Sequence, residues 1–101
     1  MIYHKLVRDK IPQIIEEKGG KAEFRTLTQE EYLLHLEKKL DEEVAEYHQD
    51  QTMEELADIL EVVYALAASQ GYTKEELETI HRKKHEDRGG FTKRLLLLSS
   101  E

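Results

Sequence analysis

The chain has 101 residues, of which 15 are Lys or Arg and 22 are Asp or Glu, so its formal net charge is −7. This length predicts one domain over residues 1–101, and the acidic balance argues against a general nucleic-acid binder, which needs surplus cations to displace counterions from phosphates. The chain has no Cys and no apolar run long enough to cross a bilayer, so we expect neither a disulfide framework nor a thiolate metal site, and a cytoplasmic protein outside the membrane.

The small size of the chain also favours self-association. A short chain buries a small fraction of its surface, and only 39% of these residues are hydrophobic. We therefore expect a homo-oligomer that is stabilised by a partner copy or by a bound ligand.

The first predicted elements are an extended lead over residues 1–8 and a short helix. Asp9 is the expected N-cap of this helix, Pro12 is tolerated in its first turn, and Gly19-Gly20 ends it. Residues 21–27 then alternate loosely between apolar and polar side chains, which is typical of a half-buried strand.

Three longer helices are each predicted by a Thr that is followed three residues later by a Glu, the pattern of a capping box. Behind these boxes, apolar side chains recur at helical spacing. The boxes are Thr28 with Glu31, Thr52 with Glu55 and Thr73 with Glu76, and the helices cover about 29–47, 53–69 and 74–87.

The chain ends in a segment over residues 91–98 that contains four consecutive leucines. This run is too short for a free helix and suits a strand or a clamp across a neighbour, so it is the expected partner of residues 21–27. The predicted fold class is mostly α, a helical bundle with a small two-stranded β ribbon.

Acidic residues stand out on two consecutive helices. Glu43 with Glu46, and Glu55 with Asp58, are spaced i, i+3, so each pair lies on one helix face. The second pair runs into the apolar residues 59–68, where an unpaired carboxylate is costly, and too few basic residues occupy matching positions on the two helices. Carboxylate oxygens are the ligands that Mg²⁺ or Mn²⁺ prefers, and Mg²⁺ binds phosphate alongside, so the pattern predicts a metal–phosphate site.

A solvated helix face is the competing interpretation of these acids. In a chain with 37% charged residues, a single acidic i, i+3 pair arises often. Two pairs on consecutive helices, one of them entering an apolar segment, favour the site.

These acids also carry a family resemblance. The letters EEVAE at residues 42–46, followed by ELAD at 55–58, resemble the EExxE and ExxD signature of the MazG-like all-α nucleoside triphosphate pyrophosphohydrolase superfamily. The opening KLVRDKIP at 5–12 and the closing RGGF at 88–91 look like its phosphoribosyl-ATP pyrophosphohydrolase-like branch. The resemblance covers nearly the whole chain.

The resemblance implies a helical subunit in dimers or tetramers and magnesium-dependent cleavage between the α and β phosphates of a nucleotide, either an NTP or dNTP or a phosphoribosyl-ATP-like compound. Pyrophosphate is released, and many members are thought to clear non-canonical nucleotides. Carried over residue by residue, the implied metal ligands are Glu43, Glu46, Glu55 and Asp58. Glu42 would form the catalytic pair with Glu43, either as a further ligand or as the group that orients the attacking water.

Phosphate binding needs cations in this acidic chain. The expected ones lie in the family-like segments, and they are Lys5, Arg8, Lys84 and Arg88. Ion pairs of these residues with surface Glu are the competing interpretation. Only eight residues separate Glu46 from Glu55, fewer than in many relatives, so the part that recognises the base is reduced or comes from another subunit.

Two other functions stay open. A non-enzymatic interaction module would use the acids as charged helix edges and dock its leucine-rich tail on a partner, and a nucleotide or metal sensor would bind without turnover. His81 and His85 are spaced for zinc on a helix, but the adjoining basic residues 82–84 favour a solvated basic face.

Overall fold

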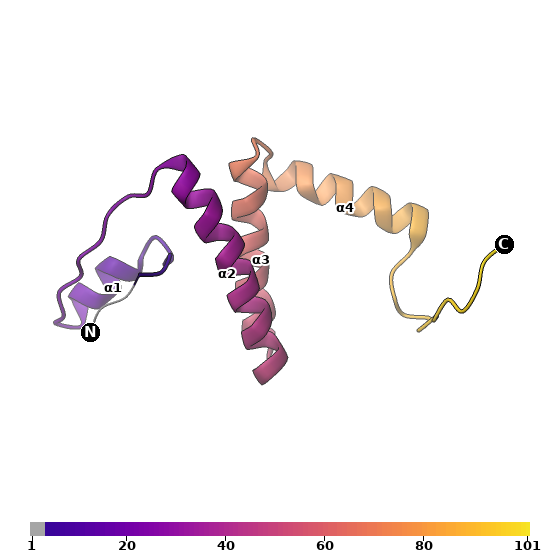
Figure 1. Ribbon diagram of the computed structural model, residues 1–101, viewed down its shortest axis with the longest axis horizontal. Helices are drawn as coiled ribbons and strands as arrows, with labels where there is room; N and C mark the ends of the chain where they lie inside the picture. The colour runs from indigo at the N-terminus through magenta and orange to yellow at the C-terminus, as the bar shows by residue number, and fades with distance from the viewer. Residues whose placement is uncertain (1–3) are drawn as a thin grey trace.

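The computed structural model describes residues 4–101 and contains four helices: α1 (Ile11–Glu17), α2 (Gln29–Asp50), α3 (Met53–Ser69) and α4 (Lys74–Arg88). The mostly α fold class predicted from the sequence is confirmed. Figure 1 shows α2 and α3 side by side in the middle of the molecule, with α1 and α4 on opposite sides of them. Across residues 4–101, no helix has both the length and the apolarity needed to span a bilayer.

α2 and α3 form an antiparallel hairpin. A full capping box opens α2, because the hydroxyl of Thr28 accepts from the N–H of Glu31 at 3.3 Å and the N–H of Thr28 donates to the Glu31 carboxylate at 3.1 Å. Gln51 ends α2 in the left-handed region, at φ 53°, so the chain reverses within two residues. The most buried apolar side chains are Leu36 on α2 and Val62 on α3, so the core lies along this hairpin.

α4 packs against α3 and leaves the hairpin at the end opposite the α2–α3 turn (Figure 1). Gly71, at φ 87°, makes the turn between the two helices, where an L side chain would be strained. The Tyr64 hydroxyl donates to Glu78 at 3.2 Å, and the Lys74 ammonium lies 4.7 Å from the centre of the Tyr64 ring. These contacts join α4 to the side of α3.

The start of α1 differs from the prediction. Lys10, and not Asp9, is the N-cap, and its side chain makes no capping hydrogen bond. The N–H of Ile11 donates instead to the carbonyl of Arg8 at 3.0 Å, so a backbone turn replaces the side-chain cap. Pro12 does lie in the first turn. Residues 4–8 of the expected extended lead contain no helix, and residues 1–3 of that lead lie outside the described part of the chain.

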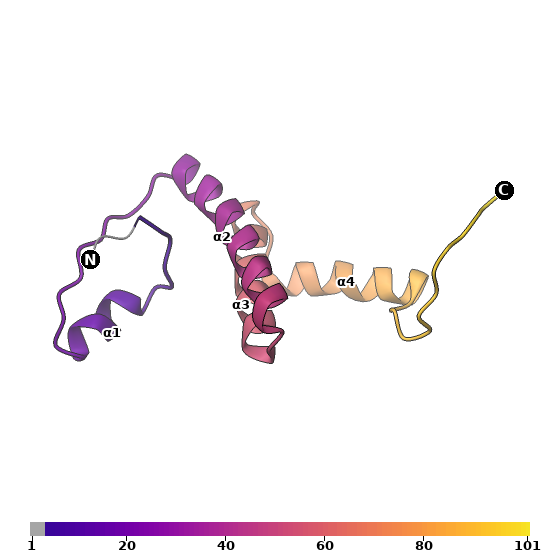
Figure 2. The ribbon, with the colours of Figure 1, turned by 60° about the horizontal axis from the view of Figure 1, so that its bottom comes forward.

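The predicted two-stranded β ribbon is wrong for residues 4–101, which contain no strand. The two segments expected to pair, 21–27 and 91–98, lie on opposite sides of the α2–α3 hairpin, as Figure 2 shows. A strand needs a neighbour to satisfy its backbone groups, and neither segment has the other within reach. Leu95 to Leu98 are consequently 80–86% exposed.

The single chain does not close into a bundle, because α1 packs against none of the other three helices. Its accessible surface is 9490 Å², whereas a compact monomer of 11.9 kDa has about 5,900 Å². Its radius of gyration is 17.8 Å, against about 13 Å for a compact domain of this length. Much apolar surface is therefore left for contacts outside this chain.

Candidate metal centre

Five carboxylates from two helices gather near the α2–α3 turn, and we call them the acidic centre. They are Glu42, Glu43 and Glu46 on α2 and Glu55 and Asp58 on α3. Glu42, Glu43 and Glu46 offer oxygens that lie within 4.8 Å of one another, and so do Glu43, Glu55 and Asp58. The hairpin thus brings together the two acidic pairs that sequence spacing placed on facing helices.

Glu43 is the innermost member of the acidic centre and belongs to both groups. Its residue surface is 6% exposed, and its Oε2 is buried without a hydrogen-bond partner. Glu55 also has a buried Oε2 without a partner. Because a buried carboxylate oxygen that no donor reaches costs free energy, these two oxygens favour a cation beside them.

The start of α3 shows why Glu55 is available. In α2 and α4, the carboxylate of the Glu at the third helical position caps the helix, since Glu31 and Glu76 each accept from the N–H of their N-cap Thr at 3.1 Å. In α3, the Thr52 hydroxyl accepts from the N–H of Glu55 at 3.3 Å, but the Glu55 carboxylate forms no such return bond. The predicted box is half-formed, and the Glu55 carboxylate turns to the acidic centre.

The acidic centre alters the proton affinity of its two innermost carboxyls. Burial raises the pKa of Glu43, and the neighbouring Glu46 raises it further. Burial also raises the pKa of Glu55, followed by the negative charges of Asp50 and Asp58. Both carboxyls therefore hold protons at a higher pH than exposed glutamates do, and a bound cation would replace those protons.

Lys39 is a member of the site that the sequence analysis missed. Its ammonium lies 3.3 Å from Glu43 Oε1 and 3.5 Å from Glu42 Oε1, and its side chain is 19% exposed. The expectation that matching basic residues were too few is therefore wrong for Glu42 and Glu43. The i, i+3 and i, i+4 spacing of Lys39 to these two acids carried the signal.

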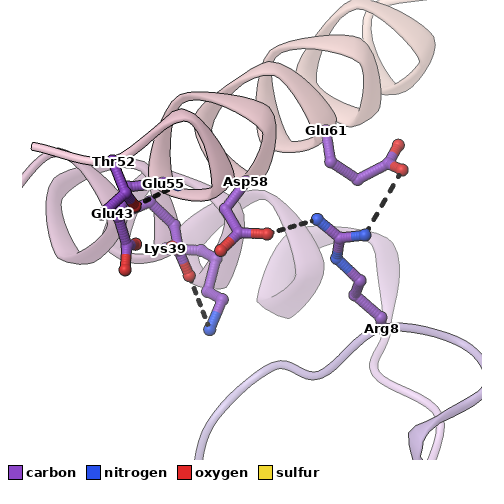
Figure 3. A network of polar contacts seen from close by, with 7 residues as sticks. All are labelled: Arg8, Lys39, Glu43, Thr52, Glu55, Asp58 and Glu61. Atoms are coloured by element: carbon purple, nitrogen blue, oxygen red, sulfur yellow. Dashed lines mark hydrogen bonds and ion pairs between the residues drawn. The ribbon is translucent and has the colours of Figure 1, made fainter. Parts of the chain in front are cut away.

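Arg8 is the second cation at the acidic centre. Figure 3 shows its guanidinium between two carboxylates of α3, with Nη2 2.6 Å from Asp58 Oδ1 and Nη1 3.9 Å from Glu61 Oε1. Its side chain is 54% exposed and that of Asp58 is 41% exposed. Lys39 and Arg8 thus each pair with carboxylates of the acidic centre.

The four expected phosphate-binding cations are not brought together in one chain. Arg8 reaches the acidic centre, and Lys5 lies three residues before it in the same segment. Lys84 and Arg88 are exposed in the C-terminal half of α4, which points away from the hairpin (Figure 1). Asp58 and the end of α3 at Ser69 are about 16 Å apart along the helix axis, so α4 begins far from the acids.

Two hollows of the surface lie on the α4 side of α3, away from the acidic centre. One of about 380 Å³ lies between α3 and α4 and is mostly apolar; its lining includes Val63, Ala67, Leu77 and Ile80. A neighbouring hollow of about 350 Å³ is lined by Tyr72 and the first half of α4. Neither of these two hollows is lined by a carboxylate of the acidic centre.

The donor set fits a hard divalent cation. All the ligand atoms are carboxylate oxygens, the choice of Mg²⁺ and Mn²⁺, and the partial exposure of Glu42, Glu46 and Asp58 leaves room for the waters that Mg²⁺ retains. His81 and His85 do not join this set, because they are exposed on α4 with their rings edge to face, 6.5 Å apart between centres.

Comparison with known proteins gives one partial similarity. No family model matches the chain, and no solved structure matches it. Over 41 residues the chain is 54% identical to a protein of Mycolicibacterium smegmatis described as an uncharacterized protein. The match covers 41% of this chain and 42% of that relative, so the chain spans less than half the length of the relative it matches. Function must therefore be argued from the chemistry of the acidic centre.

Proposed function

We propose that the chain is a magnesium-dependent nucleotide pyrophosphohydrolase of the MazG-like type, with the acidic centre as its metal site. The proposal rests mainly on Glu43, whose side chain is buried while its Oε2 lacks a donor beside the carboxylates of Glu55 and Asp58. A purely structural ion pair would leave no such oxygen, because native folds satisfy nearly all buried polar groups.

The residues of the acidic centre have separate parts in this chemistry. Glu43, Glu46, Glu55 and Asp58 would hold Mg²⁺, with Mn²⁺ as an alternative, and Glu42 at the more exposed edge would orient the attacking water and accept its proton. When bound, Mg²⁺ supplies charge neutralisation at the phosphates and a lowered pKa for its water. Water would form a new bond to phosphorus and pass its proton to Glu42, while the bond between the α and β phosphates breaks, which gives a nucleoside monophosphate and pyrophosphate.

A homo-oligomer, a dimer or a tetramer, belongs to the same proposal. The chain exposes about 3,500 Å² more than a compact monomer of its mass, and a stable interface buries only about 800 Å² on each partner, so one chain has ample surface for a second copy. A second copy would also offer surface for a nucleotide pocket beside the acids. Lys84 and Arg88 could reach phosphates only from such a copy, given the direction of α4.

The deciding experiment is pyrophosphate release across a panel of canonical and damaged NTPs and dNTPs together with phosphoribosyl-ATP, with and without Mg²⁺. We expect Mg²⁺-dependent release from at least one of them, with loss of turnover in Glu43→Gln. Glu37→Gln is the matched control, because Glu37 is exposed on the same helix and belongs to neither acidic group. If nucleotides bind but none of them releases pyrophosphate, the sensor function remains and the hydrolase is excluded.

A helical interaction module is the second candidate, and the C-terminal tail favours it. Leu95 to Leu98 are exposed, and four adjacent leucines without cover are typical of a segment that docks on another protein. The two functions differ in their response to Mg²⁺. For a module, Mg²⁺ would change the melting temperature of the wild type and that of Asp58→Ala equally.

A further inference from the structure

Arg8 occupies a place where a cation is needed. Its Nη2 lies 2.6 Å from Asp58 Oδ1 and its Nη1 lies 3.9 Å from Glu61 Oε1, one helical turn further along α3 (Figure 3). Asp58 also offers an oxygen within 4.8 Å of oxygens of Glu43 and Glu55. The same carboxylate is thus held by a guanidinium and belongs to the group of acids proposed to hold a metal.

The pairing also joins two parts of the chain. α1 packs against no other helix, and Arg8, which precedes α1, contacts α3. The next fixed contact along the chain is the pair of hydrogen bonds from Arg25 to Glu31 at the start of α2, at 3.0 and 2.7 Å. Loss of the Arg8 pairing would therefore remove a contact between α3 and the segment before α2.

We infer that Arg8 takes the place of the divalent cation at Asp58 in the metal-free protein and leaves it when the metal enters, so that metal binding releases residues 4–20 from α3. This inference rests on the proposed metal centre. A guanidinium and a divalent ion compete for the same carboxylate, and one bound to Asp58 weakens the other by charge and by contact.

The strength of the pairing suits such an exchange. The Arg8 and Asp58 side chains are 54% and 41% exposed, and ion pairs with this exposure are weak. A divalent ion held by several carboxylates can displace such a partner, whereas a fully buried ion pair would resist displacement. Once released, Arg8 is free to bind the phosphates of a substrate. Phosphate binding is the role expected for Arg8 from its place in a family-like segment of the sequence.

The first test is titration of the full chain with Mn²⁺. Calorimetry and the electron paramagnetic resonance signal of the free ion measure the binding. Arg8→Gln should bind Mn²⁺ about two- to fivefold more tightly than the wild type, as expected for loss of a weak competitor. Lys10→Gln is the matched control. It removes the same charge two residues away, and its side chain makes no hydrogen bond or ion pair within residues 4–101, so its Mn²⁺ affinity should stay at the wild-type value.

A second measurement follows the segment itself. Because the chain has no Cys, spin labels can be placed at Glu16→Cys on α1 and Ala68→Cys on α3, both exposed, and their separation measured by double electron–electron resonance. Saturating Mg²⁺ should broaden the distance distribution of the otherwise wild-type chain. With Arg8→Gln added, the broad distribution should be present without Mg²⁺.

The outcomes separate the inference from the proposed function. If Glu55→Gln binds Mn²⁺ as well as the wild type does, the acids are not the metal site, and both proposals fall. If Glu55→Gln weakens Mn²⁺ binding while Arg8→Gln matches Lys10→Gln, the metal centre stands and the exchange is overturned. An unchanged distance distribution at saturating Mg²⁺ overturns the release of residues 4–20.

Discussion

Glu43 and Glu55 face each other across the α2–α3 hairpin, and each has a buried Oε2 without a hydrogen-bond donor. Two helices that meet through carboxylates hold negative charge at a place where apolar contact would stabilise the hairpin. Such an arrangement weakens the metal-free fold and strengthens binding of any cation that enters. A substitution that removes one of these charges should therefore raise the stability of the metal-free protein and weaken metal binding.

Glu43→Gln tests this opposition. Removing the charge relieves the cost of burying it and the repulsion from neighbouring carboxylates, and we expect this gain to exceed the loss of the ion pair with Lys39. The metal-free melting temperature should then rise by about 4 °C, the effect of roughly 1 kcal/mol in a domain of this size. Addition of Mg²⁺ should then raise the melting temperature of Glu43→Gln much less than that of the wild type. Glu37→Gln, an exposed control on the same helix, should leave both values unchanged. A lower metal-free melting temperature in Glu43→Gln would contradict the role of repulsion.

Much of the helical fold follows from local patterns in the sequence. The three Thr residues before α2, α3 and α4 are all N-caps, and predicted and observed helix limits differ by three residues at most for these helices. Capping and apolar spacing act within one or two turns, so they can be read without knowing the rest of the fold. The sequence also predicted that the two acidic pairs face each other, because a short connection makes consecutive helices antiparallel neighbours.

Long-range relationships could not be predicted in the same way. The pairing of residues 21–27 with 91–98 was inferred from strand-like composition alone, and nothing local fixes whether two such segments meet. Arg8 and Asp58 are fifty positions apart, so their contact left no spacing signal. Lys39 did leave one, at i+3 and i+4 from Glu42 and Glu43, but a lysine on an acidic helix is usually solvated.

The two kinds of cap give a second prediction. Glu76→Ala removes a carboxylate that accepts from the Thr73 N–H at 3.1 Å, so it should lower the free energy of unfolding by about 0.3–1.5 kcal/mol. Glu55→Ala, at the equivalent position of α3, removes no such bond and relieves repulsion, so the metal-free protein should be as stable as the wild type or more stable. Urea unfolding of both variants without metal checks the contrast. Equal losses would mean that Glu55 caps α3 in solution.

The turn between α2 and α3 gives a third prediction. Gln51 has φ 53°, in the left-handed region that disfavours an L side chain. Gln51→Gly should therefore stabilise the hairpin by up to about 1 kcal/mol, after the extra freedom of glycine in the unfolded chain is subtracted. Gln49→Gly, within the last turn of α2, should do the opposite by a similar amount. Thermal unfolding should show the two shifts, and a loss of stability in Gln51→Gly would show that another contact of Gln51 matters more.

The capping box of α2 sets a pH dependence. Hydrogen bonding from Arg25, and then from the Thr28 backbone, lowers the pKa of Glu31 from 4.5 to about 2. A carboxyl whose pKa is lowered by folding stabilises the native state above its unfolded pKa, and that contribution disappears as the pH falls from 4.5 towards about 2. Glu31→Gln keeps a capping-box side chain without the charge, so the wild type should be more stable than this variant near neutral pH.

Unfolding by urea over a pH series measures this dependence. The stability difference between the wild type and Glu31→Gln should narrow steadily as the pH drops below 4.5. Glu30→Gln, one residue earlier in the same first turn, has no hydrogen bond from Arg25 and should show a smaller difference. A difference for Glu31→Gln that does not change with pH would show that the charge is not what stabilises the box.

The unclosed bundle leads to the last prediction. Leu34 on α2 is 65% exposed, so most of this apolar side chain is left uncovered in one chain. If a second copy covers this face, Leu34→Ser should weaken self-association about tenfold or more, because burying one leucine side chain stabilises an interface by about 1.5–3 kcal/mol. Sedimentation equilibrium measures the dissociation constant. Lys38→Ser, one turn along the same helix, changes an exposed charged residue and should have little effect. A wild-type chain that sediments as a monomer at every concentration would contradict the proposed homo-oligomer.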